Sequence, residues 1–206
     1  MGQRPDVVWI YHITDLENLP KILESGGLLS DKAMAGLDHT VIGHDHIKLR
    51  RLNEIRVPSC DGAFVGEFVP FYFCPRSPML FTIDRGRTGR PAGCQKTIVH
   101  LASKFEVGVS LGRPWAISDG NAGAFHTQFM SDPSALDGLD WEAIKASDWR
   151  GKQHQKASEF LVKEFFPWDG FVGIGCFDAN AERLLQRTLD GAAHVPKIAV
   201  KRNWYY

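Results

Sequence analysis

Three polar residues stand out because each lies inside a strongly apolar segment: His12 in VVWIYHIT, Tyr72 in VPFYF and Glu159 at the head of SEFLV. Segments this rich in β-branched and aromatic residues are typical of buried strands. A neutral histidine and a tyrosine hydroxyl can hold a ribose and lie against a nicotinamide ring, and a carboxylate can stabilise positive charge as a glycosidic bond breaks. The set suits chemistry at the ribose C1′ of NAD. Taken singly, each residue also has an ordinary explanation as a core or surface group.

Other reaction classes have less support in the sequence. There is no GxxxxGK[ST] motif, and Gly170, Gly173 and Gly175 fall in a predicted strand rather than in a phosphate-binding turn. No G-x-S-x-G segment supports a serine nucleophile. The four cysteines form no C-x-x-C pair, so we expect free thiols in a reducing compartment.

A histidine-rich segment offers a different chemistry. His39, His44 and His46 lie beside Asp45, and ligands two residues apart could share a metal ion. The helical i, i+4 spacing is absent, however, and no further Cys or His group completes a site, so we expect no metal. The alternative is a metal-dependent nuclease, whose strand cleavage EDTA would abolish.

The composition describes an ordinary globular chain. Of 206 residues, 44% are hydrophobic and 23% are charged, which allows a sizeable core without disulfides. The 24 basic and 24 acidic residues cancel, so an anionic partner must meet a local patch. No signal-peptide core and no membrane-spanning apolar run is present, and we expect a cytoplasmic protein.

The hydrophobic pattern predicts one mixed α/β domain over residues 1–206, with more strands than helices. Strands are predicted at residues 7–13, 67–73, 97–103, 114–118, 158–166, 170–177 and 197–202. Pro70 places the second of these at a sheet edge or a bulge. Helices are predicted after a cap at Thr14 or Asp15, and at 46–55, 139–147 and 180–189. Residues 31–46, 84–96 and 148–157 are predicted loops.

Several long blocks resemble the DarT family, the DNA ADP-ribosyltransferase toxins of bacterial toxin–antitoxin pairs. These blocks are IYHIT, LENLPKILESGGLL, HIKLRRLNEIRVP, VPFYFCPRSPMLF, DWEAIKASDW, SEFLV and KRNWYY, and they run in family order from Tyr11 to Tyr206. The resemblance implies a fold related to poly-ADP-ribose polymerases, with a split and mostly antiparallel central sheet. It implies NAD as donor, nicotinamide as leaving group and a base of single-stranded DNA as acceptor. The pattern is closer to the branch that modifies thymidine at ring N3 than to the guanine branch.

The resemblance also assigns residues to NAD and to catalysis. His12, Ile13 and Thr14 match the first NAD-contacting segment, and Tyr72 joins them in our cofactor set. Lys21 and Leu29 match later NAD contacts, and residues 35–53 match an element that closes over NAD. Arg51 and Glu159 match the catalytic arginine and glutamate.

Two further segments match DNA-facing parts of the family. The first is Arg76, Ser77, Pro78, Met79, Leu80 and Phe81; the second comprises Ser147, Asp148, Trp149, Arg150, His154, Gln155, Lys156, Ala157 and Ser158. The second segment and its flanks carry Lys145, Arg150, Lys152, His154 and Lys156 against one acid, which suits phosphates, and Trp149 suits a base. A solvated surface loop is the alternative explanation. The 85–96 loop, with Arg85, Arg87, Arg90 and Lys96, is a second possible phosphate contact.

The two catalytic residues have different expected roles. A carboxylate at Glu159 stabilises the oxocarbenium-like state of NAD cleavage. Thymine N3 must lose a proton, and the family assigns that work to the arginine, although a guanidinium ordinarily stays protonated. Arg51 is therefore either an unusual base or a cation that stabilises the thymine anion, and both roles stay open.

The expected partners are single-stranded DNA and a macrodomain antitoxin that removes ADP-ribose, with the enzyme as a monomer. The competing hypothesis is a catalytically silent module that binds single-stranded DNA. Retention of Arg51 and Glu159 favours the enzyme.

Overall fold

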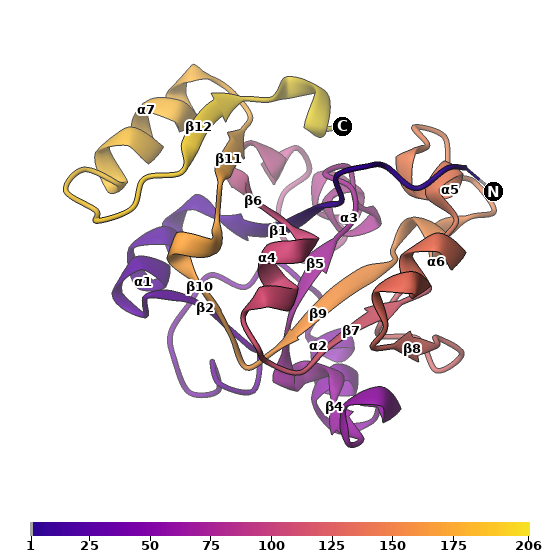
Figure 1. Ribbon diagram of the computed structural model, residues 1–206. Helices are drawn as coiled ribbons and strands as arrows, with labels where there is room; N and C mark the ends of the chain where they lie inside the picture. Colours follow the sequence, from indigo (N-terminus) through magenta and orange to yellow (C-terminus); the bar gives the residue numbers. More distant parts are fainter. Residues whose placement is uncertain (1) are drawn as a thin grey trace.

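Residues 2–206, apart from the side chain of Asp45, are described by a computed structural model with one large sheet and helices around it (Figure 1). The strands are β1 (Trp9–Asp15), β2 (Gly27–Leu29), β3 (Arg56–Val57), β4 (Ala63–Phe64), β5 (Phe68–Tyr72), β6 (Ile98–Lys104), β7 (Trp115–Ser118), β8 (Phe129–Met130), β9 (Glu159–Lys163), β10 (Phe165–Pro167), β11 (Gly173–Cys176) and β12 (Lys197–Val200). The helices are α1 (Leu19–Glu24), α2 (Asp45–Asn53), α3 (Pro78–Asp84), α4 (Phe105–Ser110), α5 (Trp141–Lys145), α6 (Gln153–Lys156) and α7 (Ala179–Thr188).

The central sheet has the order β12-β11-β6-β1-β5-β9-β7-β8 and is antiparallel except for the β11–β12 pair. All of β1 pairs with β6, whereas β1 meets β5 at one pair only, Tyr11 with Tyr72. The sheet therefore consists of two half-sheets joined at its middle, and the predicted mixed α/β class with a mostly antiparallel sheet is confirmed.

Pro70 marks neither a sheet edge nor a bulge in the ladder with β9, whose register is regular, so the prediction of an edge or a bulge is wrong. Strand β5 lies between β1 and β9, and Pro70 pairs with Leu161 of β9. The carbonyl of Pro70 faces β1, where it accepts a 2.9 Å hydrogen bond from Nδ1 of His12. Because the N and the C=O of one strand residue point the same way, the missing N–H also faces the gap between β1 and β5. An interior proline is tolerated here because no ladder bond is available to lose.

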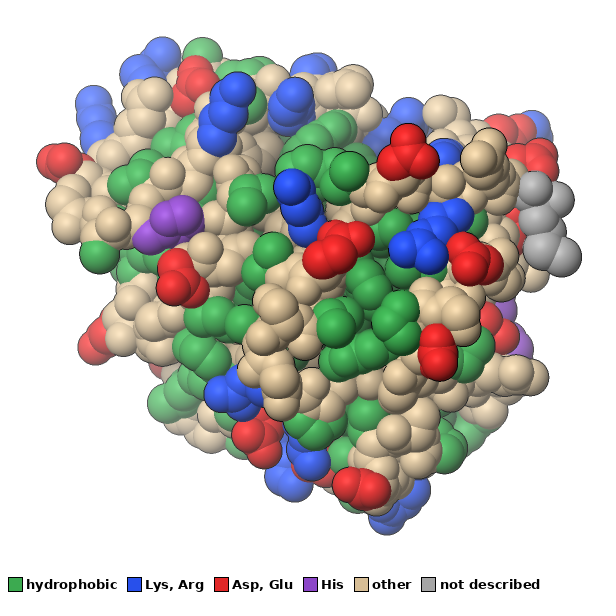
Figure 2. Space-filling model, viewed as in Figure 1, with side chains coloured by type: hydrophobic (Ala, Val, Ile, Leu, Met, Phe, Trp, Pro, Cys, Tyr) green, Lys and Arg blue, Asp and Glu red, His purple; other side chains and the backbone are tan. Residues whose placement is uncertain are grey.

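The core is strongly aromatic. Phe71, Phe160, Phe166 and Phe171 are fully buried and lie with ring centroids 4.8–6.4 Å apart. Gly108 of α4 allows the Phe160 ring to approach, because a Cβ there would lie 2.4 Å from it. On the face shown in Figure 2, basic and acidic side chains are interspersed, as the balanced composition predicts.

Most predicted elements occur, with shifted ends. Asp15 caps the turn before α1 by accepting from the Glu17 N–H, and α2 and α7 overlap their predicted ranges. The prediction missed α3, α4 and the short α6, which interrupts the predicted 148–157 loop. Among the described residues, no helix combines the length and apolarity that a membrane crossing requires.

Candidate active site

Glu159, the first residue of β9, is a buried carboxylate with defined partners. Its side chain is 1% exposed, and Oε1 accepts a 3.0 Å hydrogen bond from the Ala122 N–H. Its own N–H donates a 2.9 Å hydrogen bond to Oγ of Ser118, and Ser118 is the last residue of the neighbouring strand β7. The side chain is thus oriented by two strands and by the 119–128 connection between β7 and β8.

Arg51 reaches the same carboxylate from α2, over a separation of 108 residues in the chain. Nη1 lies 3.2 Å from Oε1 and 3.0 Å from Oε2 of Glu159. Nη2 is buried and has no partner among the described residues. A buried N–H group without an acceptor costs free energy, so this side of the guanidinium fits an electron-rich ligand atom such as those of NAD or a nucleobase.

The surroundings of Arg51 hold it as a cation. Burial by itself lowers the pKa of the guanidinium, but the nearby Glu159, Asp31 and Tyr72 raise it, and the net pKa is raised. A raised pKa disfavours proton release, which is the opposite of what a general base requires. Of the two roles open from the sequence, this electrostatic environment supports the cationic one.

Tyr72 and His12 complete the central group. Tyr72 is directly opposite Glu159 in the β5–β9 ladder, so the two side chains share a face of the sheet. Burial, with Glu159 second, raises the pKa of Tyr72 and keeps its hydroxyl protonated. Burial lowers the pKa of His12; with Nδ1 donating to Pro70, its Nε2 is the acceptor of a neutral ring. These two groups have the protonation states expected from the sequence.

The other predicted NAD contacts differ in burial. Ile13 and Thr14 are buried on β1, and Thr14 Oγ1 accepts from Asn18 Nδ2 at 3.1 Å. Leu29 is half-buried on β2. Lys21 is exposed and pairs with Asp38, Nζ to Oδ2 at 2.8 Å, so its side chain anchors the segment that is expected to close over NAD. The side chain of Lys21 is therefore already engaged in this structure.

The two predicted DNA-facing segments meet in space. Phe81 of α3 contacts Trp149 with ring centroids 5.5 Å apart, and contacts Tyr206 at 5.1 Å. The Arg76 guanidinium lies 4.5 Å from the Tyr206 ring centroid, and its buried Nε has no partner among the described residues. Three aromatic rings and an arginine thus gather from three distant segments. Tyr206 was not among the predicted DNA-facing residues, although it belongs to the KRNWYY block.

Several members of these segments do not have the exposure predicted for them. Ser77 is buried and caps α3 by accepting from the Leu80 N–H, and Leu80 is itself fully buried. Lys156 is 1% exposed, and its Nζ donates to the carbonyls of Ile144 at 2.6 Å and Ala146 at 2.9 Å. A lysine can be buried where carbonyl oxygens receive its ammonium, so Lys156 is not an exposed loop cation.

Other basic side chains are also engaged. Arg150 pairs with Asp148 and Lys152 with Asp140, and the buried Asp15 binds Arg90, which the sequence had offered as a phosphate contact. His154 packs directly on Gly120, where a Cβ would overlap the ring. Ala157 and Ser158 are buried beside Glu159. The remaining predicted contacts, Pro78, Met79, Ser147 and Gln155, are half-buried or exposed.

His154 is also held away from its charged form. Burial lowers its pKa, the neighbouring His126 ring, 4.3 Å away, lowers it further, and Asp119 opposes them. A neutral ring does not neutralise a phosphate, so any contact from His154 to DNA is a hydrogen bond or a stacking contact.

The described side chains of the histidine-rich segment do not form a ligand set. His39 donates from Nδ1 to the Leu37 carbonyl and accepts at Nε2 from Lys48, which leaves no ring nitrogen for a metal. In the part of the chain that the structure describes, no group of three or more His, Cys, Asp and Glu side chains could hold a metal ion. Asp45, which lies beside these histidines in the sequence, has its side chain outside that part.

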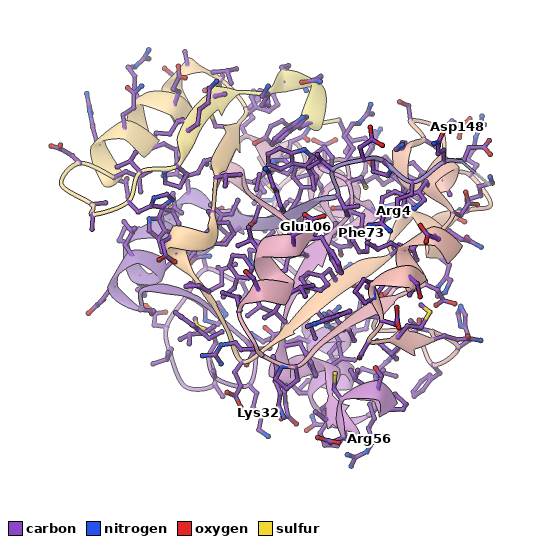
Figure 3. All side chains as sticks on the ribbon, viewed as in Figure 1. Arg4, Lys32, Arg56, Phe73, Glu106 and Asp148 are labelled. Atoms are coloured by element: carbon purple, nitrogen blue, oxygen red, sulfur yellow. The ribbon has the colours of Figure 1, made fainter. Side chains whose placement is uncertain are left out.

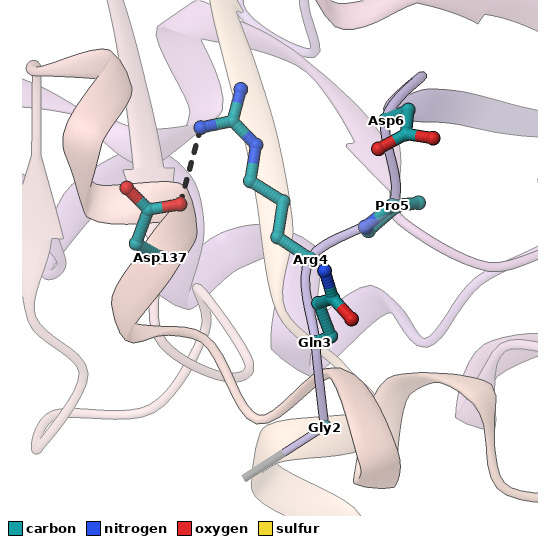
Figure 4. Close-up of a pocket in the computed structure, with 6 residues that line it drawn as sticks. All are labelled: Gly2, Gln3, Arg4, Pro5, Asp6 and Asp137. Carbon is teal, nitrogen blue, oxygen red and sulfur yellow. Dashed lines mark hydrogen bonds and ion pairs between the residues drawn. The ribbon is translucent and has the colours of Figure 1, made fainter.

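A surface hollow of about 500 Å³ near the amino-terminal segment contains none of the predicted site residues (Figure 4). It is lined by residues 2–6 and Asp137, and Arg4 pairs with Asp137 across it at 3.2 Å. This hollow plays no part in the arrangement around Glu159.

Comparison with known proteins identifies the family of the chain. The family described as ssDNA thymidine ADP-ribosyltransferase, DarT, matches residues 11–206. A DNA ADP-ribosyl transferase of Thermus aquaticus is 38% identical over 201 residues, covering 96% of this chain and 88% of that protein. The structure of Thermus sp. 2.9 DarT in complex with ADP-ribosylated ssDNA matches with a TM-score of 0.93 at 34% identity, covering 100% of this chain and 99% of that one. The same protein in complex with NAD+ matches at 0.89 and 32% identity, over 99% and 100% of the two chains. The chain belongs to the DarT family.

Proposed function

We propose that this protein transfers ADP-ribose from NAD to ring N3 of a thymidine in single-stranded DNA. As a DarT-family member it is an NAD-dependent DNA ADP-ribosyltransferase. The acceptor base and the position of attachment are our proposal, supported by the family description and by the HIKLRR and CPRSPML blocks. The observation that carries the proposal is the buried Arg51–Glu159 pair, 3.0 Å apart, beside Tyr72 and His12.

The reaction breaks the bond between the ribose C1′ and the nicotinamide nitrogen, and forms a bond between C1′ and thymine N3. The bonding electrons leave with nicotinamide, which becomes neutral, and N3 gives up its proton. Glu159 acts on the positive charge that develops at C1′, where a fixed carboxylate in a buried site stabilises the transition state. Its orientation by Arg51 and the Ala122 amide means that little rearrangement accompanies the step.

Arg51 is proposed to stabilise the thymine anion as its proton passes to water. The raised pKa keeps the guanidinium charged, and the unpartnered Nη2 offers a donor for thymine oxygen or for NAD. Neutral His12 and the protonated Tyr72 hydroxyl are proposed to hold the nicotinamide ribose. Phe81, Trp149 and Tyr206 would offer faces for bases near the acceptor.

The test is mass spectrometry of oligonucleotides with thymidine or guanosine as the only candidate acceptor base, after incubation with NAD. We expect the mass of one ADP-ribosyl group on the thymidine oligonucleotide with the wild type, and its loss by several orders of magnitude with Glu159→Ala. Glu106→Ala, which removes an exposed carboxylate on α4 (Figure 3), is the matched control. If only the guanosine oligonucleotide is modified, the protein belongs to the guanine-modifying branch. If neither oligonucleotide is modified, the hypothesis of a catalytically silent binding module is favoured.

We further propose that a macrodomain antitoxin reverses this modification in the cytoplasm. The support is membership of a family of toxin–antitoxin enzymes, and the consequence is toxicity on expression without the partner. Growth after induction, with and without a macrodomain hydrolase, tests this, with Glu159→Ala as the inactive control.

A further inference from the structure

A second hollow, of about 450 Å³, lies next to the catalytic elements and outside both predicted DNA-facing segments. Ile55, Pro58 and Phe129 supply apolar walls, and Arg56 and Gln128 supply polar groups at the rim. The volume falls within the roughly 300–1,000 Å³ that is typical of small-ligand sites. A hollow of this size covers too little surface to be a protein interface by itself.

Phe125 is the unusual member of this hollow. Its side chain is 70% exposed, the largest exposure among the large hydrophobic residues of the described chain. The Arg50 guanidinium lies 5.5 Å from the centroid of its ring, and Arg50 is held there by a 3.2 Å hydrogen bond to the Gly123 carbonyl. An aromatic face open to solvent with a guanidinium beside it is what a nucleobase and its phosphate need.

The hollow is linked to the catalytic pair through the backbone. Arg50 immediately precedes Arg51 on α2, and Phe125 lies three residues after Ala122, whose N–H binds Glu159. In Figure 3, Arg56 of this hollow lies at the lower edge of the molecule, whereas Asp148 of the DNA-facing loop lies at the upper right. The hollow is therefore a separate place of contact from the Phe81–Trp149–Tyr206 cluster.

We propose that this hollow is a subsite for a nucleobase that flanks the acceptor thymidine, with the base stacked on Phe125 and its phosphate met by Arg50. The proposal rests on the function proposed above, since it takes single-stranded DNA as the ligand. Arg56 and Glu54 of the lining balance each other in charge, and Arg56 already donates to the Gly62 carbonyl at 2.8 Å and lies over the Phe64 ring. Arg50, beside Phe125, therefore supplies the positive charge that suits a phosphate. The subsite makes affinity depend on nucleotides beyond the acceptor on one side.

The test compares a short oligonucleotide, carrying the thymidine acceptor with minimal flanks, with versions extended by a few nucleotides on the 5′ or the 3′ side. Binding is measured by fluorescence anisotropy, and transfer by mass spectrometry. For the wild type we expect one extension to tighten binding. Phe125→Ala should reduce that gain by about 5- to 150-fold, the usual effect of removing one stacking face, and Phe125→Trp should restore it.

Leu184→Ala is the matched control, because Leu184 is 49% exposed on α7, at the other end of the sheet (Figure 1). If Phe125→Ala leaves the increase in affinity from both the 5′ and the 3′ extension unchanged, the subsite is overturned. The same holds if Phe125→Ala weakens binding of a protein partner while the increase in DNA affinity on extension is unchanged. Failure of the proposed function is distinct, because the wild type would then modify no oligonucleotide at all. If the wild type transfers ADP-ribose but the increase in affinity on extension does not depend on Phe125, only the subsite is refuted.

Discussion

Removing the Glu159 carboxylate should destabilise the folded protein as well as abolish transfer. In the free enzyme, Glu159 accepts from Arg51 Nη1 through both oxygens and from the Ala122 N–H, and both side chains of the ion pair are almost wholly buried. Glu159→Ala leaves a buried cation without its counter-charge and an amide without its acceptor. Breaking a buried pair from one side costs about 3–5 kcal/mol.

That cost converts to a measurable shift in melting temperature. For a domain of this length, about 1 kcal/mol corresponds to about 2–4 °C, so Glu159→Ala should melt about 6–20 °C below the wild type. Glu159→Gln keeps an oxygen for Arg51 and Ala122 and should lose less. Adding Arg51→Met to Glu159→Ala should recover part of the loss, because the unpaired charge is then gone.

The assay is thermal unfolding followed by circular dichroism, without NAD, with Glu106→Ala as the control for an exposed carboxylate. A melting temperature for Glu159→Ala within about 2 °C of the wild type would refute the reasoning, since the buried pair would then contribute nothing in the free enzyme. Additive losses in the double variant would refute it equally.

Three further predictions follow from single contacts. Arg51→Lys should reduce transfer about 100- to 1,000-fold, nearly as far as alanine, because an ammonium cannot replace the guanidinium fork; retention within about tenfold would favour the role of base. Arg150→Gln should reduce the slope of log binding constant against log salt concentration by about 0.7, whereas Lys156→Gln, at a buried position, should weaken DNA binding without changing that slope. A changed slope in Lys156→Gln would show that Lys156 contacts a phosphate. Burial lowers the pKa of His100 to about 4. The unfolded chain binds that proton near pH 6.5, so stability is complete above that pH and is lost as the pH falls towards 4. From pH 7 to pH 5, urea unfolding should show a loss of about 2 kcal/mol that His100→Gln removes.

Local patterns predicted the strands well because burial on both faces leaves a dense apolar signature. Strands β6 and β9, in which all residues but the last are buried, are examples. The start of α3 also had a local signal, Ser77 followed by Pro78, which is a common way for a helix to begin. The same residues match a DNA-facing block of the family, and that match carries no information about a helix.

The errors have a common physical origin, which is that composition records a residue's type and not its neighbours. Lys156 lies in a polar, basic stretch, and only the carbonyls of Ile144 and Ala146 explain its burial. Pro70 looks like an edge residue until the gap beside β1 is known. The Arg51–Glu159 pair spans 108 residues, so its prediction came from the family resemblance and not from any local pattern.

The single ladder pair between β1 and β5 gives the sheet a mechanical seam. Two half-sheets meet at Tyr11 and Tyr72, and the nearby Pro70 cannot extend the ladder. A change in the relative twist of the halves would therefore break no other ladder bond and would strain only the side-chain bond from His12 to the Pro70 carbonyl. His12 lies on one half and Glu159 on the other. NAD bound by both residues would link the two half-sheets. The force needed to separate the half-sheets should therefore rise as the occupancy of the NAD site rises.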